Sequence, residues 1–376
     1  MAGKNIDKND KVYIKIMETI DKGILTAPKT DGEFSRAFIE YLKIVYSPEE
    51  AELVQHLSMQ KSMTIEELAE VSGVDAEKVN EIMDSLSKRA AVEGRYKKRL
   101  PSIPTLLNLH MFYPEIKEDD LEAAKLYQDF FIKEKYYKFY GTSSKGTPML
   151  RSIPIEQAIH SEEKTYTAEE AHAFVQNLPT EDLALVPCPC RTRTEKMGIR
   201  ECADHLPIAC CVFIGGAADR FIELGLGKPV TKRQAIDYID EVVELGLIPT
   251  TNNSINGPFG IMCMCCGCCC SNVRGRTVWG DNPTAVRPSN FLPEATEDCV
   301  MCGTCEERCF LDAITVDDAE GRAVADPEKC IGCGVCAIGC PEGALKLHRY
   351  DRPEPMFQNT VELMMTVARD NDRLPS

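Results

Sequence analysis

"CVMCGTCEERC", from Cys299 to Cys309, and "CIGCGVCAIGC", from Cys330 to Cys340, share the cysteine spacing C-x2-C-x2-C-x3-C, and Pro341 follows the second run. Three cysteines separated by two residues each can surround one iron–sulfur cluster from a tight loop. In the two-cluster arrangement, the last cysteine of each run binds the cluster of the other run. The repeated spacing therefore predicts two [4Fe-4S] clusters near the C-terminal end.

Glycines in both runs support this interpretation. Gly303, Gly332 and Gly334 allow the backbone to approach inorganic sulfides and to donate amide hydrogen bonds to them. C-x2-C pairs also bind zinc, but eight cysteines in two such runs fit iron–sulfur clusters better. The predicted ligands are Cys299, Cys302, Cys305 and Cys340 for the first cluster, and Cys330, Cys333, Cys336 and Cys309 for the second.

Residues 290–350 resemble the bacterial two-cluster ferredoxins in these two runs and in the stretch between them, which predicts a hairpin turning at Gly321. One departure is Phe310, where that family commonly has proline after the fourth cysteine. The change removes no ligand. The resemblance implies two clusters that are fully bound by cysteine and that transfer single electrons.

All nineteen cysteines lie between Cys188 and Cys340. A disulfide framework would require an oxidising compartment, and neither a secretion signal nor a long apolar segment is present in the sequence. We therefore expect metal or redox chemistry in a cytoplasmic protein without a membrane span. The net charge of -16 disfavours broad binding to nucleic acids.

Eleven cysteines remain outside the two runs, six of them in "CMCCGCCC", residues 263–270. Adjacent cysteines cannot all face one point in a regular element, but Gly267 permits an irregular loop that directs some thiolates to one metal centre and others to a second. We expect at least one additional iron–sulfur cluster, and we expect about a third of the eleven cysteines, Cys211 first among them, to be small buried apolar residues. The candidate ligands are Cys188, Cys190, Cys202, Cys210, Cys263, Cys265, Cys266, Cys268, Cys269 and Cys270.

"PCPCR", "CADHLPIAC" and "CMCCGCCC", followed by a ferredoxin module, resemble a poorly characterised group of ferredoxin-type iron–sulfur proteins from strict anaerobes, over residues 150–350. The resemblance implies cofactors better than it implies a substrate. His205 is a further ligand, a proton donor at the centre or a structural histidine. Basic residues crowd these motifs: Arg191, Arg193, Lys196, Arg200, Arg274 and Arg276. They either lower the pKa of thiols, offset the charge of a cluster, bind an anionic substrate or cofactor, or form a solvated face.

Residues 34–100 predict a winged-helix-like region: a helix, a capping box from Ser47 to Glu50, a second box from Thr64 to Glu67, a longer helix and a basic stretch. The would-be recognition helix is rich in acidic residues, so DNA binding is disfavoured and a structural or docking role is preferred.

The predicted fold class is α+β with several domains. We expect a mainly helical region with a connector helix over residues 1–149, a mixed α/β cysteine-rich domain over 150–285, a ferredoxin domain over 286–350 and a tail or helix over 351–376. Within the middle domain, capping boxes from Thr167 to Glu170 and from Thr231 to Gln234 predict the starts of two helices.

No phosphate-binding loop and no dinucleotide fingerprint are present in the sequence, so the electron donor is expected to be a redox protein: a ferredoxin, a flavoprotein or a reductase subunit. The leading hypothesis is an electron-transfer protein or subunit of an anaerobic redox system. One alternative is a reductase with a catalytic iron–sulfur or cysteine centre in the middle domain. The other is a redox-responsive iron–sulfur regulator.

Overall fold

The computed structural model divides the chain into two compact units, which we describe separately. The first holds residues 1–140, 196–198 and 371–376, and the second holds residues 141–195 and 199–370. Across the described part of the chain, no helix has the length and hydropathy that crossing a membrane requires. The residues described are 10–59, 61–95, 98–101, 118–256, 260–276, 280, 282, 284–353 and 355–374.

The first unit begins with three helices and a short ribbon. The helices are Lys11–Ile20 (α1), Arg36–Val45 (α2) and Pro48–Val54 (α3), and the ribbon pairs Lys29–Thr30 (β1) with Glu33–Phe34 (β2). The Ser47 side chain accepts from the Glu50 amide, and the Glu50 carboxylate accepts from the Ser47 amide, which confirms the predicted capping box.

Two further helices, Ile65–Ser72 (α4) and Ala76–Lys88 (α5), follow in this unit. The predicted box from Thr64 to Glu67 opens α4, and Gly73 ends it with φ of 70°. A three-stranded sheet of order β3-β5-β4 accompanies them, made of Met63–Thr64 (β3), Val92–Arg95 (β4) and Lys98–Pro101 (β5). These elements follow the predicted order, and their assignment as a winged helix stays a prediction.

The aromatic-rich segment before residue 141 packs into the core of the first unit. It consists of Glu118–Tyr127 (α7), the π-helix Gln128–Lys133 (η2) and Tyr137–Gly141 (α8). Phe130 is fully buried and meets Phe38 of α2 edge to face, with ring centroids 4.9 Å apart. The predicted connector before α7, residues 102–117, lies outside the described residues.

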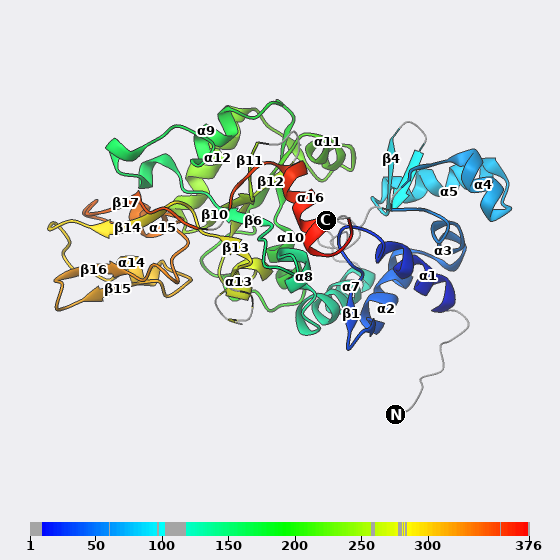
Figure 1. The fold of residues 1–376 in the computed structure, drawn as a ribbon, viewed down its shortest axis with the longest axis horizontal. Helices are drawn as coiled ribbons and strands as arrows, with labels where there is room; N and C mark the ends of the chain where they lie inside the picture. The colour runs from blue at the N-terminus through cyan, green and yellow to red at the C-terminus, as the bar shows by residue number, and fades with distance from the viewer. Residues whose placement is uncertain are drawn as a thin grey trace. The chain divides into compact units, whose positions relative to one another are not determined.

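A seven-stranded, mostly antiparallel sheet organises the second unit (Figure 1), in the order β13-β6-β10-β12-β8-β7-β9. Only the β13–β6 pair is parallel. Its strands are Leu150–Ser152 (β6), Leu183–Pro187 (β7), Cys210–Ile214 (β8), Lys228–Pro229 (β9), Ile248–Asn252 (β10), Gly260–Cys265 (β12) and Val286–Arg287 (β13).

Helices connect these strands. They are the 3-10 turns Glu156–Ala158 (η3) and Ser161–Glu163 (η4), and Ala171–Gln176 (α9), Pro189–Lys196 (α10), Gly216–Glu223 (α11), Lys232–Glu244 (α12) and Ser271–Arg276 (α13). Thr231 and Gln234 form the predicted capping box of α12. The box expected from Thr167 to Glu170 does not form: Glu170 itself precedes α9, and its carboxylate accepts from the Thr165 hydroxyl instead.

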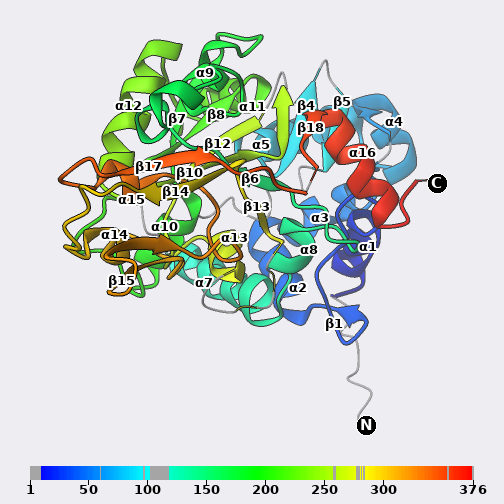
Figure 2. The same ribbon diagram turned by 60° about the vertical axis from the view of Figure 1, so that its left-hand side comes forward.

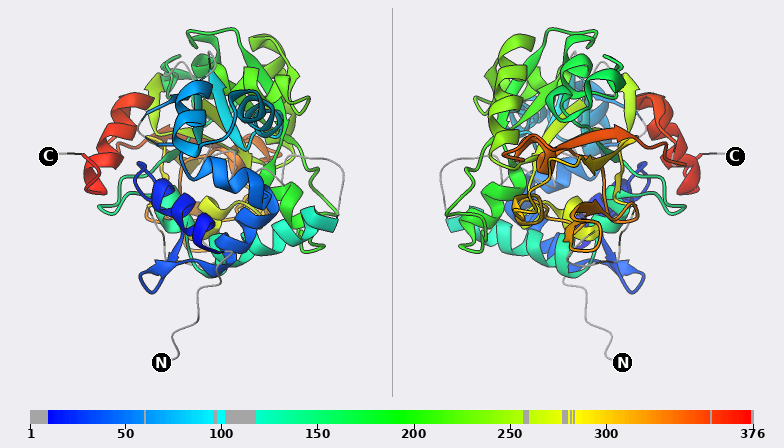
Figure 3. Two further views of the ribbon diagram at one scale, coloured as in Figure 1. Left: turned by 90° about the vertical axis from the view of Figure 1, so that its right-hand side faces the viewer. Right: turned by 90° about the vertical axis from the view of Figure 1, so that its left-hand side faces the viewer.

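The ferredoxin segment follows the sheet (Figure 2; yellow to orange in the right-hand view of Figure 3). Phe291–Ala295 (β14) pairs with Leu345–Arg349 (β17), and Ile314–Asp317 (β15) pairs with Arg322–Ala325 (β16). Gly321 turns the second pair with φ of 68°, as predicted. Two one-turn helices carry cysteines, Thr304–Glu307 (α14) and Val335–Ile338 (α15).

The last elements of the second unit return to the strand after β10. Phe357–Asn359 (β18) pairs in parallel with Ser254–Asn256 (β11), and Thr360–Asp370 (α16) follows. The structure thus shows the predicted mixture of helices and strands. One hydrophobic core holds residues of the sheet, of α12 and of the ferredoxin segment together, among them Ile248, Val243 and Ile331. The predicted division into a middle domain and a ferredoxin domain therefore stays a prediction.

Candidate iron–sulfur and thiolate sites

The first candidate site is a cavity at the end of β14 and β17. Four cysteines line it, three from the first run and the last from the second run: Cys299, Cys302, Cys305 and Cys340. Gly303 has φ of 78°, which lets the chain turn between Cys302 and α14. Val300 and Met301 beside it are 61% and 43% exposed, and Cys302 is exposed too, so this cavity lies next to the surface.

The second candidate site is a more deeply buried cavity between β14, β15 and α15. Its four cysteines again combine the two runs: Cys309, Cys330, Cys333 and Cys336. Burial raises the pKa of Cys330 to about 11 and that of Cys333 to about 12. At neutral pH these thiols therefore stay protonated unless a positive charge such as a metal ion is bound beside them.

Backbone amides reach the sulfurs of this second cavity. The Gly332 amide donates to Cys330 Sγ at 3.3 Å, and the Ala313 amide donates to Cys309 Sγ at 3.4 Å. Such bonds stabilise thiolates and tune the potential of a bound cluster. Both cavities therefore bring together the four cysteines that the sequence analysis grouped, and their donor chemistry fits an iron–sulfur cube.

The remaining cysteines begin at the central strand β12. Its side chains alternate, so Met262 and Met264 face one side and Cys263 and Cys265 the other. Cys263 lies beside Cys211 of β8, because the preceding pair in the register is Met262 with Val212. Loop and helix residues bring Cys188, Cys190 and Cys270 to the same side.

Six thiols interact there in a closed ring, which we call the six-thiol ring. Each sulfur interacts with two others, in the order Cys188, Cys190, Cys270, Cys265, Cys263, Cys211 and back to Cys188. Hydrogen bonds from Cys263, Cys270 and Thr250 lower the pKa of Cys265 to about 6 against the effect of burial. A thiol that ionises near neutral pH is well suited to binding metal.

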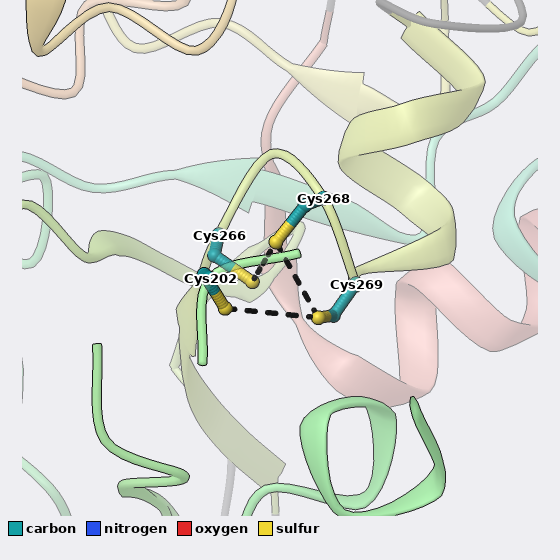
Figure 4. Close-up of side chains that lie close together, drawn as sticks. All are labelled: Cys202, Cys266, Cys268 and Cys269. Carbon is teal, nitrogen blue, oxygen red and sulfur yellow. Dashed lines mark hydrogen bonds between the residues drawn. The ribbon is translucent and has the colours of Figure 1, made fainter. Parts of the chain in front are cut away.

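Four other sulfurs form a separate, compact group, which we call the thiol quartet (Figure 4). Three belong to the loop between β12 and α13, and one to the turn between α10 and β8: Cys266, Cys268, Cys269 and Cys202. The side chains point toward one another, and all four sulfurs lie within 4.8 Å of one another.

The two cysteines at the start of β8 have different surroundings. The structure does not place Cys210, a predicted candidate ligand, in either group: its thiol interacts with the Tyr238 hydroxyl. Cys211, expected to be a buried apolar residue, is buried, and its thiol also belongs to the six-thiol ring. The alternation of strand side chains puts these neighbours on opposite faces, and this signal was available in the sequence. His205 is exposed and lies in neither group.

Arg191 lies between the two thiol groups and is fully buried. Its Nη1 donates to the Met264 carbonyl at 2.7 Å, and its charge interacts with Cys188 and Cys211 of the ring and with Cys266 of the quartet. These thiols raise its pKa above the ordinary value even though burial opposes the charge. A buried guanidinium whose electrostatic neighbours are thiols fits an anionic metal–thiolate centre. Of the other basic residues, Arg193 and Lys196 are buried as well.

Comparison with known proteins identifies the C-terminal part. The family model of the 4Fe-4S dicluster domain matches residues 298–344. An uncharacterized ferredoxin of Methanocaldococcus jannaschii is 37% identical over 20% of this chain and 44% of its own length. The polyferredoxin-like subunit of the aliphatic sulfonate oxidoreductase of Pyrococcus furiosus is 31% identical over 21% of this chain and 47% of its own length.

An archaeal NADPH glutamate synthase of Archaeoglobus fulgidus is 30% identical over 18% of this chain and 13% of its own length. The chain thus spans less than half the length of these curated relatives, and no solved structure matches it. Residues 298–344 are a 4Fe-4S dicluster domain of the ferredoxin type, and this domain supports an iron–sulfur electron-transfer function.

Proposed function

We propose that the protein transfers single electrons within an anaerobic redox system, as a separate carrier or as a subunit. The observation that carries the proposal is the pair of cavities, each lined by four cysteines drawn from both runs. Cys299, Cys302, Cys305 and Cys340 would hold one [4Fe-4S] cluster, and Cys309, Cys330, Cys333 and Cys336 the other. When bound, each cluster supplies a one-electron redox couple.

The protein's own residues shield the second cluster site and expose the first. Phe310 and Ile331 line the second cavity, and Ile331 is 1% exposed. The first cavity borders the exposed Val300 and Met301. Electrons would therefore enter or leave at the first site, where a redox partner can approach over an apolar surface.

The six-thiol ring is the place we propose for a further iron–sulfur cluster. Four of its cysteines are buried and the other two, Cys190 and Cys263, are partly buried, which limits the access of water to a bound cluster. The guanidinium of Arg191 offsets negative charge there. Cysteines of the ring and second-cavity cysteines, such as Cys265 and Cys330, belong to the same hydrophobic core. This arrangement favours a relay that continues from the ferredoxin segment into the sheet.

The partner is proposed to be another redox protein. Two relatives bear names of larger redox systems, the aliphatic sulfonate oxidoreductase and the glutamate synthase named above. The sequence contains no nucleotide-binding motif of its own, so electrons would come from a protein that binds the nucleotide or flavin. A ferredoxin, a flavoprotein or a reductase subunit fits the role.

A second candidate function is a reductase with its catalytic centre at the six-thiol ring. The specific observation in its favour is the number of thiols, because a cube that only relays electrons needs four ligands and the ring offers six. Adding small ligands to the reduced protein separates the two functions. A change in the electron paramagnetic resonance (EPR) spectrum of a middle-region cluster favours the reductase, and an unchanged spectrum favours the relay.

The ligand exchange between the two runs gives a sharp test of the proposed cluster sites. Cys302→Ser and Cys340→Ser should weaken the same cluster signal in the EPR spectrum of the reduced protein, although these residues belong to different runs. Cys333→Ser and Cys309→Ser should weaken the other signal. Each substitution should also remove up to about four irons per chain.

Cys210→Ser serves as the matched control, because its thiol lies outside both cavities, the ring and the quartet. It should retain the iron content and both signals. If Cys302→Ser and Cys309→Ser weakened one signal while Cys340→Ser weakened the other, the assignment would be wrong. A total of only about eight irons per chain in the unaltered protein would overturn the further cluster.

A further inference from the structure

We propose that the thiol quartet, Cys202, Cys266, Cys268 and Cys269, binds a single tetrahedrally coordinated metal ion, zinc, and not an iron–sulfur cube. This site goes beyond the proposed electron transfer, and it leaves the six-thiol ring as the site of the further cluster. The inference rests on the spacing of the sulfurs, on their surroundings and on the contrast with the other cysteines.

The sulfur separations have the size of a one-ion site. Cys266 and Cys268 Sγ lie 3.7 Å apart, Cys268 and Cys269 Sγ lie 3.5 Å apart, and Cys202 and Cys269 Sγ lie 3.9 Å apart (Figure 4). Zinc–sulfur bonds of about 2.3 Å in tetrahedral geometry place the four sulfurs about 3.8 Å apart. These three separations therefore match those around a single tetrahedral ion, and the remaining ones lie within 4.8 Å.

A cube requires a wider set of ligands, because each thiolate binds a different iron. The predicted cube ligands show this difference within the same protein: among the described residues, no three of the eight cysteines in the two cavities have sulfurs within 4.8 Å of one another. The same holds for the six-thiol ring. Only the quartet is compact, so its chemistry differs from that of the other fifteen cysteines.

The surroundings of the quartet fit a closed metal site. The Thr194 hydroxyl donates to Cys269 Sγ at 3.2 Å, as groups around metal ligands do. A divalent ion with four thiolates carries two negative charges. Arg191 interacts with Cys266 and Arg200 with Cys202, so two guanidinium groups are in place to offset them.

Three of the four cysteines are buried and Cys268 is partly buried, and all four are able to serve as ligands to one ion. Zinc bound by four cysteines in this way is typical of structural sites. The ion would join the turn that carries Cys202 to the loop between β12 and α13, and the four thiols would release their protons on binding. It would thereby fix Gly267 and its neighbours beside the second ferredoxin cavity.

The test is the metal content and the zinc-edge X-ray absorption of the full chain purified without oxygen. We expect one zinc per chain with four sulfur neighbours at about 2.3 Å. Cys268→Ser should lose most of this zinc and keep its iron. Thr194→Val, which keeps every ligand, should weaken zinc binding by about 10- to 100-fold in a chelator competition.

Two controls separate this site from the proposed function. Cys210→Ser should keep both metals, and Cys263→Ser, in the six-thiol ring, should lose iron and keep zinc. Loss of about four irons from Cys268→Ser, or zinc absent from the unaltered protein with all iron in clusters, would overturn the proposal. One iron in place of zinc on the same four sulfurs would overturn the choice of zinc. None of these three results would affect the two proposed cubes.

Discussion

At the scale of single residues, Gly267 shows why the cysteine-rich loop tolerates no larger side chain. An added Cβ at this position would lie 2.5 Å from Cβ of Phe310. Phe310 stands where the two-cluster ferredoxins commonly have proline, and it lines the second cavity. This close approach joins the loop of the thiol quartet to the wall of a cluster site.

Replacing Gly267 by alanine should therefore disturb two sites at once. We expect Gly267→Ala to lower the free energy of unfolding by about 1–3 kcal/mol, the usual cost of overpacking, and to reduce the metal content of the quartet. Denaturant unfolding and metal analysis measure both effects.

A double variant provides the control for this contact. Phe310→Ala removes the atoms that an alanine at position 267 would meet, so the two substitutions together should cost less than the sum of their separate costs. Strict additivity would contradict the proposed contact.

The residue scale is also where sequence reasoning was least complete. The eight cysteines of the two runs could be grouped from the sequence, because spacing places three sulfurs of each run in one loop and the known two-cluster arrangement supplies the fourth from the other run. The grouping of the other eleven depends on contacts between segments far apart in the chain. Cys202 joins the quartet from about sixty residues away in sequence, and no local pattern predicts this.

At the scale of elements, three of the four capping boxes predicted from the sequence form in the structure. The boxes at Ser47, Thr64 and Thr231 form as predicted, because capping depends on residues within one turn. The box at Thr167 fails because Glu170 hydrogen-bonds with Thr165 in the preceding turn. The Glu170 carboxylate thus binds Thr165 and does not reach the Thr167 amide, so the predicted capping box is absent.

The junction of α1 and α2 gives a prediction for pH dependence. Asp10, which directly precedes α1, is 1% exposed and pairs with Lys43 of α2 at 2.7 Å and with Arg36. Burial by itself would raise the pKa of Asp10. The hydrogen bonds and charges of Lys43 and Arg36 together lower it by more, so the net shift of the pKa is downward. A carboxylate with a lowered pKa in the folded state stabilises the protein above its unfolded pKa, and the contribution disappears as the pH falls through the folded pKa.

Asp10→Asn should therefore lower the free energy of unfolding by about 1.5–3 kcal/mol at pH 7, the range for hydrogen bonds to charged groups. The difference in the free energy of unfolding between Asp10→Asn and the unaltered protein should shrink as the pH falls below about 3.9, the usual pKa of an aspartate. Denaturant unfolding of the first unit between pH 7 and pH 3 measures it.

Asp31→Asn, in the exposed turn between β1 and β2, is the matched control and should leave stability unchanged. If the loss of unfolding free energy in Asp10→Asn grew toward low pH, the proposed contribution of the ion pairs would be wrong.

At the scale of the whole molecule, the seven-stranded sheet and the ferredoxin segment share one core. Arg308, directly after α14, donates to the Val335 carbonyl within the ferredoxin segment and to the Glu244 carbonyl at the end of α12. The sequence predicted the two regions separately, because composition marks each of them. Their common core involves residues far apart in the chain, which no sequence motif describes.

The central claim is that this chain holds at least two four-iron clusters and uses them to carry electrons. The most direct measurement is iron and sulfide analysis of the protein purified without oxygen, together with its low-temperature EPR spectrum after reduction with dithionite. The account predicts at least about eight irons and eight sulfides per chain, and a spectrum of two neighbouring reduced clusters that interact magnetically. Zinc without acid-labile sulfide, and no signal on reduction, would contradict it.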